Sequence, residues 1–235
     1  MKSKKFTYDG HSYCFHIMNE KDAIQKHHFA GELFDVGELH EMAKHIKDGD
    51  VIADIGANVG NHTIFFAKNF PKSTIIPFEP NNEAILLLNK NLASNNCPNV
   101  DNSYIGNGLS EQNVNATSWR NGGNNLGGSK VLLNLDIKTV PTARRDNFHD
   151  ISLLKGDDVF KTKNVDFLKI DVEGHEFEVL AGLKKTIKRD RPKIFIEIWN
   201  ENKPRFSKWI KSNKYKIIFS DSRYAKVQNH LIIPL

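Results

Sequence analysis

One acidic side chain in this chain comes just before a pair of glycines. Val51–Gly60 reads V-I-A-D-I-G-A-N-V-G, so that Asp54 precedes Gly56 by two residues and Gly60 follows four residues later. Glycine permits a positive φ and a close approach of a ligand to the backbone, so this segment predicts a loop around a ligand. The spacing differs from that of dinucleotide and P-loop sites. A carboxylate at Asp54 suits a cationic or amino-acid ligand and would repel a diphosphate.

A second acid, Glu79, follows another apolar run. It lies 25 residues after Asp54, close to the offset of about 20 residues at which an acid accepts hydrogen bonds from ribose hydroxyls in βαβ nucleotide sites. An acid at this place would also be favoured at the N-terminus of a helix that begins near Asn81. The glycine loop upstream favours the ribose role. We therefore interpret the loop and Glu79 as the S-adenosylmethionine (SAM) site of a Rossmann-like methyltransferase.

The elements that must position these acids alternate between strands and helices, which is typical of a doubly wound, mostly parallel α/β sheet. Ligands bind beyond the carboxyl ends of the strands in such sheets. Polar residues follow the predicted strands here, namely Asp54, Glu79, Asn107 with Gly108, Asp171, and Glu197 with Trp199. The predicted strands are Val51–Ile55, Ser73–Glu79, Val100–Ile105, Val165–Asp171 and Pro192–Trp199, the helices are Asn61–Asn69, Asn81–Asn95, His175–Lys188 and Lys203–Asn213, and Tyr215–Ser220 with His230–Ile233 form a closing C-terminal antiparallel pair.

Other segments carry weaker signals. Residues 1–30 are predicted to form an N-terminal hairpin extension that turns at Asp9-Gly10, followed by one domain over residues 31–235 that opens with a helix at Gly37–Lys47. Residues 119–128 are so rich in Gly and Asn that we expect a mobile loop with no packed element there. Residues 131–145 show strand-like alternation, and residues 148–160 suit either a strand or a helix.

Three segments in this order resemble the FkbM family of SAM-dependent methyltransferases. They read D-I-G-A-N-V-G-N-H-T, then F-E-P-N followed by L-L-L-N-K-N, then F-L-K-I-D-V-E-G-H-E-F-E-V-L-A-G-L, and the resemblance covers roughly residues 31–200. It implies a Rossmann-like class I methyltransferase fold, SAM as the cofactor, and O-methylation of a hydroxyl on a sugar, glycan or natural product. The residues that it places around the cofactor are Asp54, Gly56, Asn58, Gly60 and Asn61 at the amino-acid end, Glu79 with Pro80 at the ribose, Asn107 with Gly108 at the adenine, and Asp35 upstream, where Phe34-Asp35 replaces the Tyr-Glu pair expected for the family.

The acids after the strand Val165–Asp171 are the candidates for catalysis. The methyl carbon of SAM is already electrophilic, so the protein must align an acceptor oxygen with it and remove a proton. His175 has the side chain best suited to a general base because its unperturbed pKa is near 6.5. Asp171 and Glu173 lie beside it at the expected transfer point, where Asp171 could orient the acceptor or bind a divalent ion such as Mg²⁺. Alternatively, Glu173 caps a helix and His175 is a surface residue of its first turn.

The totals place the chain among soluble globular proteins. Of its 235 residues, 39% are hydrophobic and 26% are charged, and no apolar run approaches the roughly 20 residues of a membrane-spanning helix. The N-terminal lysines are not followed by an apolar stretch, so we expect no secretory signal. Two cysteines give neither a disulfide framework nor a zinc pattern. We expect a cytoplasmic protein without a membrane span, and the sequence leaves homodimer formation open.

Two other function classes compete with this interpretation. A formal net charge of +5 is compatible with a nucleic-acid substrate. However, the chain lacks an Asn/Asp-Pro-Pro-Tyr/Phe segment after Val165–Asp171, and acids there would repel phosphates, so a nucleic-acid partner is not expected. A non-catalytic module that binds SAM or a sugar is the other alternative, and the intact loop and acids argue against it. An NAD-dependent enzyme does not fit the glycine spacing.

Overall fold

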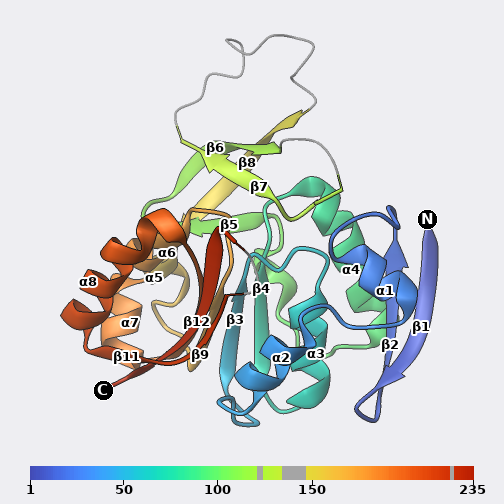
Figure 1. The fold of residues 1–235 in the computed structure, drawn as a ribbon, viewed down its shortest axis with the longest axis horizontal. Coiled ribbons are helices and arrows are strands. Elements are labelled where there is room, and N and C mark those ends of the chain that lie inside the picture. Colours follow the sequence, from blue (N-terminus) through green and yellow to red (C-terminus); the bar gives the residue numbers. More distant parts are fainter. Residues whose placement is uncertain (121–123, 134–146, 223–224) are drawn as a thin grey trace.

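The computed structural model describes residues 1–120, 124–133, 147–222 and 225–235, and a six-stranded sheet runs through its centre (Figure 1). The strand order is β11-β12-β10-β9-β3-β4. Neighbours from β10 to β4 are parallel, whereas β12 is antiparallel to both β10 and β11. The predicted Rossmann-like sheet with a C-terminal antiparallel pair is therefore confirmed. The strands are β3 (Val51–Ile55), β4 (Thr74–Phe78), β9 (Phe167–Ile170), β10 (Lys193–Trp199), β11 (Tyr215–Asp221) and β12 (Val227–Pro234).

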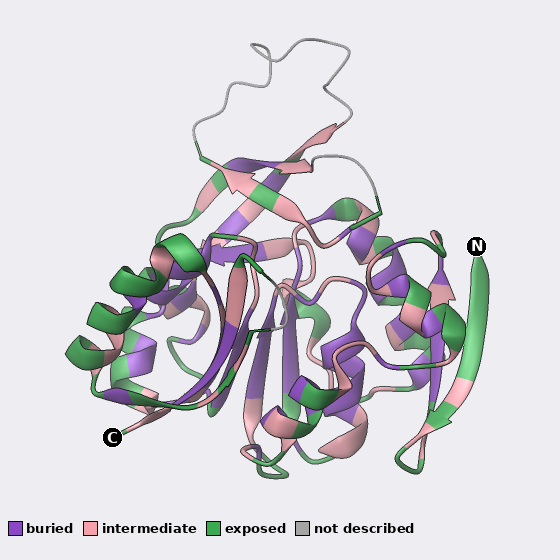
Figure 2. Ribbon diagram, in the orientation of Figure 1, coloured by how far each residue is buried: buried purple, intermediate pink, exposed green. Residues whose placement is uncertain are grey.

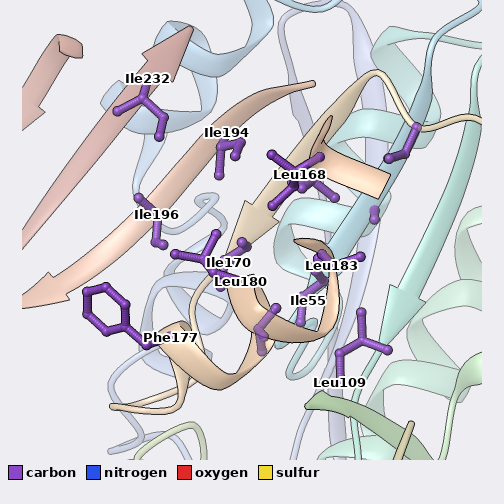
Figure 3. Packing of buried hydrophobic residues seen from close by; sticks show 14 of the residues in the cluster. Ile55, Leu109, Leu168, Ile170, Phe177, Leu180, Leu183, Ile194, Ile196 and Ile232 are labelled. Carbon is purple, nitrogen blue, oxygen red and sulfur yellow. The ribbon is translucent and has the colours of Figure 1, made fainter. Parts of the chain in front are cut away.

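Helices cover both faces of this sheet. Successive side chains of a strand point to opposite faces, and both faces carry apolar side chains that the helices bury. Leu168 packs in the cluster below α6 and α7, while its neighbour Phe167 packs in the cluster below α2 and α3. Figure 3 shows the first cluster, and Figure 2 shows that buried residues concentrate in the central strands. Each fully buried Leu, Ile or Phe contributes about 1.5–3 kcal/mol. The helices are α2 (Val36–Ala43), α3 (Asn61–Asn69), α4 (Asn82–Asn95), α5 (Gly156–Val159), α6 (Glu176–Gly182), α7 (Lys184–Asp190) and α8 (Lys203–Asn213).

The predicted N-terminal hairpin is present as β1 (Lys2–Tyr8) and β2 (His11–Ile17), which pair antiparallel. Two asparagines of α4 bind the backbone of β2 in place of a further strand. The Asn95 amide exchanges two hydrogen bonds with Cys14, of 2.7 and 3.0 Å, and the Asn91 side chain accepts from the His16 N–H at 2.7 Å. A short helix, α1 (Gln25–Ala30), follows the hairpin. These bonds leave fewer backbone groups on β2 unpaired, which an edge strand otherwise exposes.

The predicted strand Val100–Ile105 is wrong. A 3-10 helix (Asn102–Tyr104) occupies its middle, and only single bridges link Val100 and Ile105 to β4 and the residue after it. The Asp101 carboxylate accepts a hydrogen bond from the Ser103 N–H at 3.2 Å, a local interaction that competes with strand pairing. The next strand, β5 (Asn107–Ser110), begins later than expected and belongs to a different sheet.

A second, four-stranded sheet lies above the carboxyl ends of the central strands (Figure 1). Its order is β5-β8-β6-β7. We expected no packed element over residues 119–128, and this is wrong in part. The strand β6 extends as far as Arg120, and Leu126 is buried. Residues 121–123 lie outside the described part of the chain. We predicted strand-like alternation over residues 131–145, of which residues 134–145 also lie outside the described part of the chain. The strands are β6 (Val114–Arg120), β7 (Ser129–Leu132) and β8 (Phe148–Lys155). The segment 148–160, which suited either a strand or a helix, therefore contains both β8 and the short helix α5.

The predicted helix His175–Lys188 is divided into α6 and α7. Gly182 ends α6 where the backbone of β5 passes close by, since a Cβ built on Gly182 would lie 1.9 Å from the Ser110 carbonyl oxygen. The predicted helix Lys203–Asn213 is confirmed as α8, which follows a 3-10 turn (Asn200–Asn202). Within the described ranges, no helix combines the length and apolar composition needed to cross a lipid bilayer.

Candidate functional site

A cavity of about 360 Å³ opens at the carboxyl ends of the central strands. Its walls come from the loops after β3, β4, β9 and β10, from the four-stranded sheet, and from the residues around α1 and α2. The volume lies within the range of about 300–1,000 Å³ that is typical of small-molecule sites. The position is the one at which open α/β sheets bind ligands.

The glycine loop after β3 forms one side of this cavity. Gly56 has a φ of +83°, and a Cβ there would lie 1.9 Å from the backbone oxygen of Asp171. The loop after β3 can therefore approach the loop after β9 only because residue 56 is glycine. Asn58 also lines the cavity, with a φ of +50°. Gly60 begins α3 and packs toward Leu88, away from the cavity wall.

Asp54 does not line the cavity, although we predicted that it contacts the ligand. Its side chain is fully buried, with one oxygen 3.2 Å from the Lys169 ammonium and the other accepting a 2.6 Å hydrogen bond from the Thr63 hydroxyl. Lys169 also donates to the Gly56 carbonyl oxygen at 2.7 Å. Asp54 therefore contacts the cavity wall only indirectly: it pairs with Lys169, and Lys169 binds the backbone of the glycine loop.

Lys169 itself is a site residue that the sequence analysis missed. Burial lowers the pKa of its ammonium group, but the carboxylates of Asp54 and Asp171 outweigh this effect and the net direction is upward. Lys169 lines the cavity wall and lies 3.8 Å from Asp171. The signal was available, because a lysine in the middle of F-L-K-I is a charge within an otherwise apolar strand, and such a charge needs a partner.

Glu79 lies in the wall beside the glycine loop. Its two carboxylate oxygens accept hydrogen bonds of 2.8 Å from the Asn58 and Asn81 N–H groups. Burial raises the pKa of this carboxyl to about 7. Pro80 and Gly108 continue the wall, and a Cβ on Gly108 would lie 2.7 Å from Leu153. The predicted partner of Gly108, Asn107, is outside the cavity lining.

The segment before α2 closes another side. Asp35 lines the cavity with a φ of +54°. Asn61 holds the preceding residue, because its amide accepts from the Phe34 N–H and donates to the Phe34 carbonyl oxygen, both at 3.0 Å. Asp35 and Asn61 therefore both line the cavity, and their contact with a cofactor stays a prediction.

Three acids face the cavity at the ends of β9 and β10. Asp171 and Glu173 are the predicted ones, and Glu197 was noted only as the end of a strand. Burial, together with the Asp171 charge, raises the pKa of Glu173 to about 8. Burial and the same neighbouring carboxylates also raise the pKa of Glu197. Such a group of acids with few cations nearby favours a positively charged ligand.

His175 lies in the cavity lining, but its ring is held by protein partners. Its Nε2 is 3.0 Å from the Ser110 hydroxyl, and its Nδ1 is 3.8 Å from the Glu178 carboxylate. Burial lowers its pKa. His175 is the first capping residue of α6, and the Glu176 carboxylate accepts a 2.8 Å bond from the Gly174 N–H in the same turn. His175 is therefore a buried residue at the start of α6 whose ring contacts Ser110 and Glu178.

The Gly- and Asn-rich stretch completes the cavity. Leu126 packs against Val59 and Ala84, next to the glycine loop and α4. Its N–H donates a 2.7 Å bond to the Asp22 carboxylate, and the Asn81 amide donates to the Ser129 hydroxyl at 3.0 Å. Residues 124–129 therefore cover the cavity from above, between the N-terminal segment and α4.

The part of the chain that the structure describes contains no group of three or more His, Cys, Asp or Glu side chains arranged to hold a metal ion. Asp171 has Lys169 as its nearest charged partner. The site therefore gives no support to the Mg²⁺ alternative.

The strand order, the glycine loop and the acid after the next strand define a Rossmann-like class I methyltransferase fold. Solved structures agree. A crystallised FkbM methyltransferase from Methylobacillus flagellatus KT has a TM-score of 0.54 at 17% identity, covering 79% of this chain and 44% of that chain. M. jannaschii TYW2, solved in complex with AdoMet, has a TM-score of 0.50 at 16% identity, covering 99% and 87%. This chain spans less than half the length of the crystallised FkbM protein.

The chain belongs to the FkbM family of methyltransferases, because residues 54–217 match the family model for the methyltransferase FkbM domain. Methyltransferase 1 of Beauveria bassiana (strain ARSEF 2860) is 27% identical over 180 residues, which cover 70% of this chain and 68% of the relative. Methyltransferase sdnD of Sordaria araneosa is 23% identical, covering 91% of this chain and 89% of the relative. The resemblance seen in the sequence is confirmed.

Proposed function

We propose that the protein is a SAM-dependent O-methyltransferase that acts on a hydroxyl of a sugar, a glycan or a small-molecule natural product. The observation that carries this proposal is a single cavity in which the glycine loop and Glu79 stand on one side and the acids Asp171, Glu173 and Glu197 on the other. The first side suits a nucleoside, and the second suits a cation. SAM carries both.

The residues of the cavity fit SAM. The Glu79 carboxylate would accept hydrogen bonds from the ribose hydroxyls, as in other βαβ nucleotide sites. Among the described residues, the buried Asn58 side-chain oxygen has no hydrogen-bond partner, so it is available to a donor group of the ligand. Pro80, Gly108 and Leu153 line the cavity together and offer apolar surface to a planar base. Asp171 and Glu173 would face the positive charges.

The chemistry then divides between cofactor and protein. When bound, SAM supplies an electrophilic methyl group on a sulfonium. The chain's own task is to hold an acceptor oxygen in line, to exclude water and to receive a proton. The four-stranded sheet and residues 124–129 cover the cavity and limit water access. An acid at the ends of β9 and β10 can receive the proton, whereas the His175 ring is already engaged by Ser110.

The acidic wall also bears on the alternatives. Nucleic-acid methylation would bring phosphates toward the Asp171 carboxylate, and like charges repel. The rRNA methylases among the structural neighbours share 11–13% identity with this chain and therefore attest to the fold alone. A non-catalytic module has no need for three acids around one cavity, of which Glu173 and Glu197 are largely desolvated.

Calorimetric titration of SAM and of its demethylated product, S-adenosylhomocysteine (SAH), tests the cofactor. We expect saturable binding to the wild-type protein and a loss of at least about tenfold in affinity for Glu79→Gln, because one charge-assisted hydrogen bond contributes about 1.5–3 kcal/mol. Glu201→Gln, on the exposed surface, is the matched control and should bind normally. A screen of hydroxyl acceptors with labelled SAM follows. Absence of SAM and SAH binding to the wild type would overturn the proposal.

A further inference from the structure

The wall at the ends of β10 and β12 contains three polar atoms that have no hydrogen-bond partner among the described residues. They are Glu197 Oε2, Trp199 Nε1 and Asn229 Oδ1, and all three residues line the cavity. Glu197 lies directly opposite Asn229 in the antiparallel register, and Trp199 is two residues further along the same strand. Side chains at these positions share one face of the sheet. An unpartnered buried polar group costs about 1–3 kcal/mol, so three together indicate a ligand.

The surrounding contacts fix these groups. The Asn229 side chain is nine-tenths buried, and its amide nitrogen donates a 2.7 Å hydrogen bond to the Glu38 carboxylate. That bond sets the orientation of the amide and leaves Oδ1 as the available acceptor. On the other side, the Lys130 ammonium lies 4.4 Å from the centre of the Trp199 ring and so links β7 to the indole. The site is built from both sheets.

We propose that Glu197, Trp199 and Asn229 form the acceptor subsite, that this subsite binds a neutral molecule with neighbouring hydroxyl groups, and that Glu197 takes the proton of the hydroxyl that is methylated. This inference rests on the proposed function. Two acceptor oxygens and one N–H donor match a pair of hydroxyls, each of which can both donate and accept. A phosphorylated or otherwise anionic acceptor is disfavoured by the Asp171 carboxylate. The buried cation beside it, Lys169, is already paired with Asp54, and the Lys130 ammonium lies over the Trp199 ring.

These groups account for every bond and proton in the methyl transfer. The acceptor oxygen forms a bond to the methyl carbon while the carbon–sulfur bond breaks, and that electron pair goes to sulfur. The O–H proton passes to the Glu197 carboxylate. Glu197 is surrounded by the charges of Asp171, Glu173, Glu176 and Lys169, and the net effect of burial and of these acids keeps its proton on when no cation is bound. A positively charged ligand in the cavity favours its ionised form.

The indole N–H signal of Trp199 reports acceptor binding without turnover. The chain contains three tryptophans, at positions 119, 199 and 209, so a ¹H–¹⁵N spectrum shows few indole signals, and Trp199→Phe identifies the relevant one. With SAH bound, we expect neutral polyols such as methyl glycosides and inositol to shift that signal, and sugar phosphates to leave it in place. If no neutral polyol moves the Trp199 signal, or if only sugar phosphates or RNA do, the inference is overturned.

Methyl transfer from labelled SAM tests the role of Glu197. For Glu197→Gln, we expect saturable SAM binding to persist and kcat to fall at least about 100-fold, as for the loss of a general base. The wild-type rate should rise with pH through one ionisation that the variant lacks, and Glu197→Asp should recover part of the rate. Unchanged kcat in Glu197→Gln would overturn the inference while leaving the proposed function intact. Failure of the wild type to bind SAM, measured first, would instead overturn the proposed function.

Discussion

At the scale of single residues, the site depends on charges that the fold buries. Asp54 and Lys169 are both almost completely inaccessible and pair at 3.2 Å, and Lys169 also donates to the Gly56 carbonyl oxygen. A buried pair of this kind adds little net stability, but removing one partner leaves an uncompensated charge. The carboxyls of Glu79, Glu173 and Glu176 are buried in the same region without a cation for each.

Replacing Lys169 should therefore have a large effect. Lys169→Met keeps the volume of the side chain and leaves the Asp54 carboxylate buried and unpaired, so we expect a loss of about 3–5 kcal/mol in the free energy of unfolding. Urea denaturation measures it. Lys72→Met, which removes an exposed pair with Asp48, is the matched control and should cost less than about 1 kcal/mol. Equal losses in the two variants would show that the buried pair has no special role.

The buried carboxyls predict a pH dependence with a definite sign. Burial raises the pKa of Glu79 and Glu176 to about 7 and that of Glu173 to about 8, from an unfolded value of 4.5. The folded state thus holds more protons than the unfolded state between pH 4.5 and 8, and stability falls as pH rises through this window. For the ligand-free protein, we expect a decrease of about 2 kcal/mol or more between pH 5 and pH 8.

Denaturation at several pH values checks this expectation, and Glu173→Gln should flatten the upper part of the curve because it removes the highest of the three pKa values. A stability that rises between pH 5 and pH 8 would contradict the assigned pKa directions.

At the scale of elements, the site is defined by a close contact between two loops. The loop after β3 meets the loop after β9 at Gly56, where no side chain can be accommodated. That contact brings Asn58 into the same cavity as Asp171 and Glu173. Gly106, in the turn before β5, also has a positive φ, of +100°, but has open space around its Cα.

These two glycines separate backbone strain from steric exclusion. Gly106→Ala should cost about 1–2 kcal/mol, the strain of placing a Cβ in the left-handed region. Gly56→Ala adds a collision with the Asp171 backbone and should cost at least about 1–3 kcal/mol more, and it should abolish SAH binding. Thermal denaturation and calorimetry measure both. If the two variants lose the same stability, the loops do not pack as closely as described.

At the scale of the whole molecule, the N-terminal hairpin shares its core with the central sheet. Tyr13 and Phe15 of β2 pack in the same cluster as Ile52 of β3 and Phe65 of α3. Because a shared core couples the two parts, we propose that the hairpin and residues 31–235 unfold together. The small sheet is tied to the N-terminal segment by the bond between Asp22 and Leu126.

Cooperative unfolding can be followed with two local probes. Cys14 is buried in β2, so its thiol reacts only when the hairpin opens, while the three tryptophans lie at positions 119, 199 and 209, outside the hairpin. In a Cys97→Ser background, we expect thiol labelling and tryptophan fluorescence to give the same denaturant midpoint. A lower midpoint for Cys14 would show that the hairpin opens independently.

The sequence by itself determined most strands of the central sheet, the glycine loop and the place of Glu79 after β4. These features are local, because an apolar run, a glycine turn and an amphipathic segment that follow one another predict a strand, a loop and a helix without distant residues. The segment around Asp101 was wrong for a related reason, since a local side-chain bond there favoured a turn over the pattern of apolar residues. The pairing of β11 with β12 was also predicted correctly, from two short apolar runs close together in sequence.

Only the tertiary structure decided which of the polar residues share one cavity. We expected Asp54 to contact the ligand. Instead, its side chain is buried in the core, where it pairs with Lys169, 115 residues away in the sequence. Asn229 carried no signal in the sequence and joined Glu197 only because β12 pairs antiparallel with β10. Hydrophobic periodicity fixes which face of an element is buried, whereas the partner of a buried charge or amide depends on strand order and register, which distant segments set together.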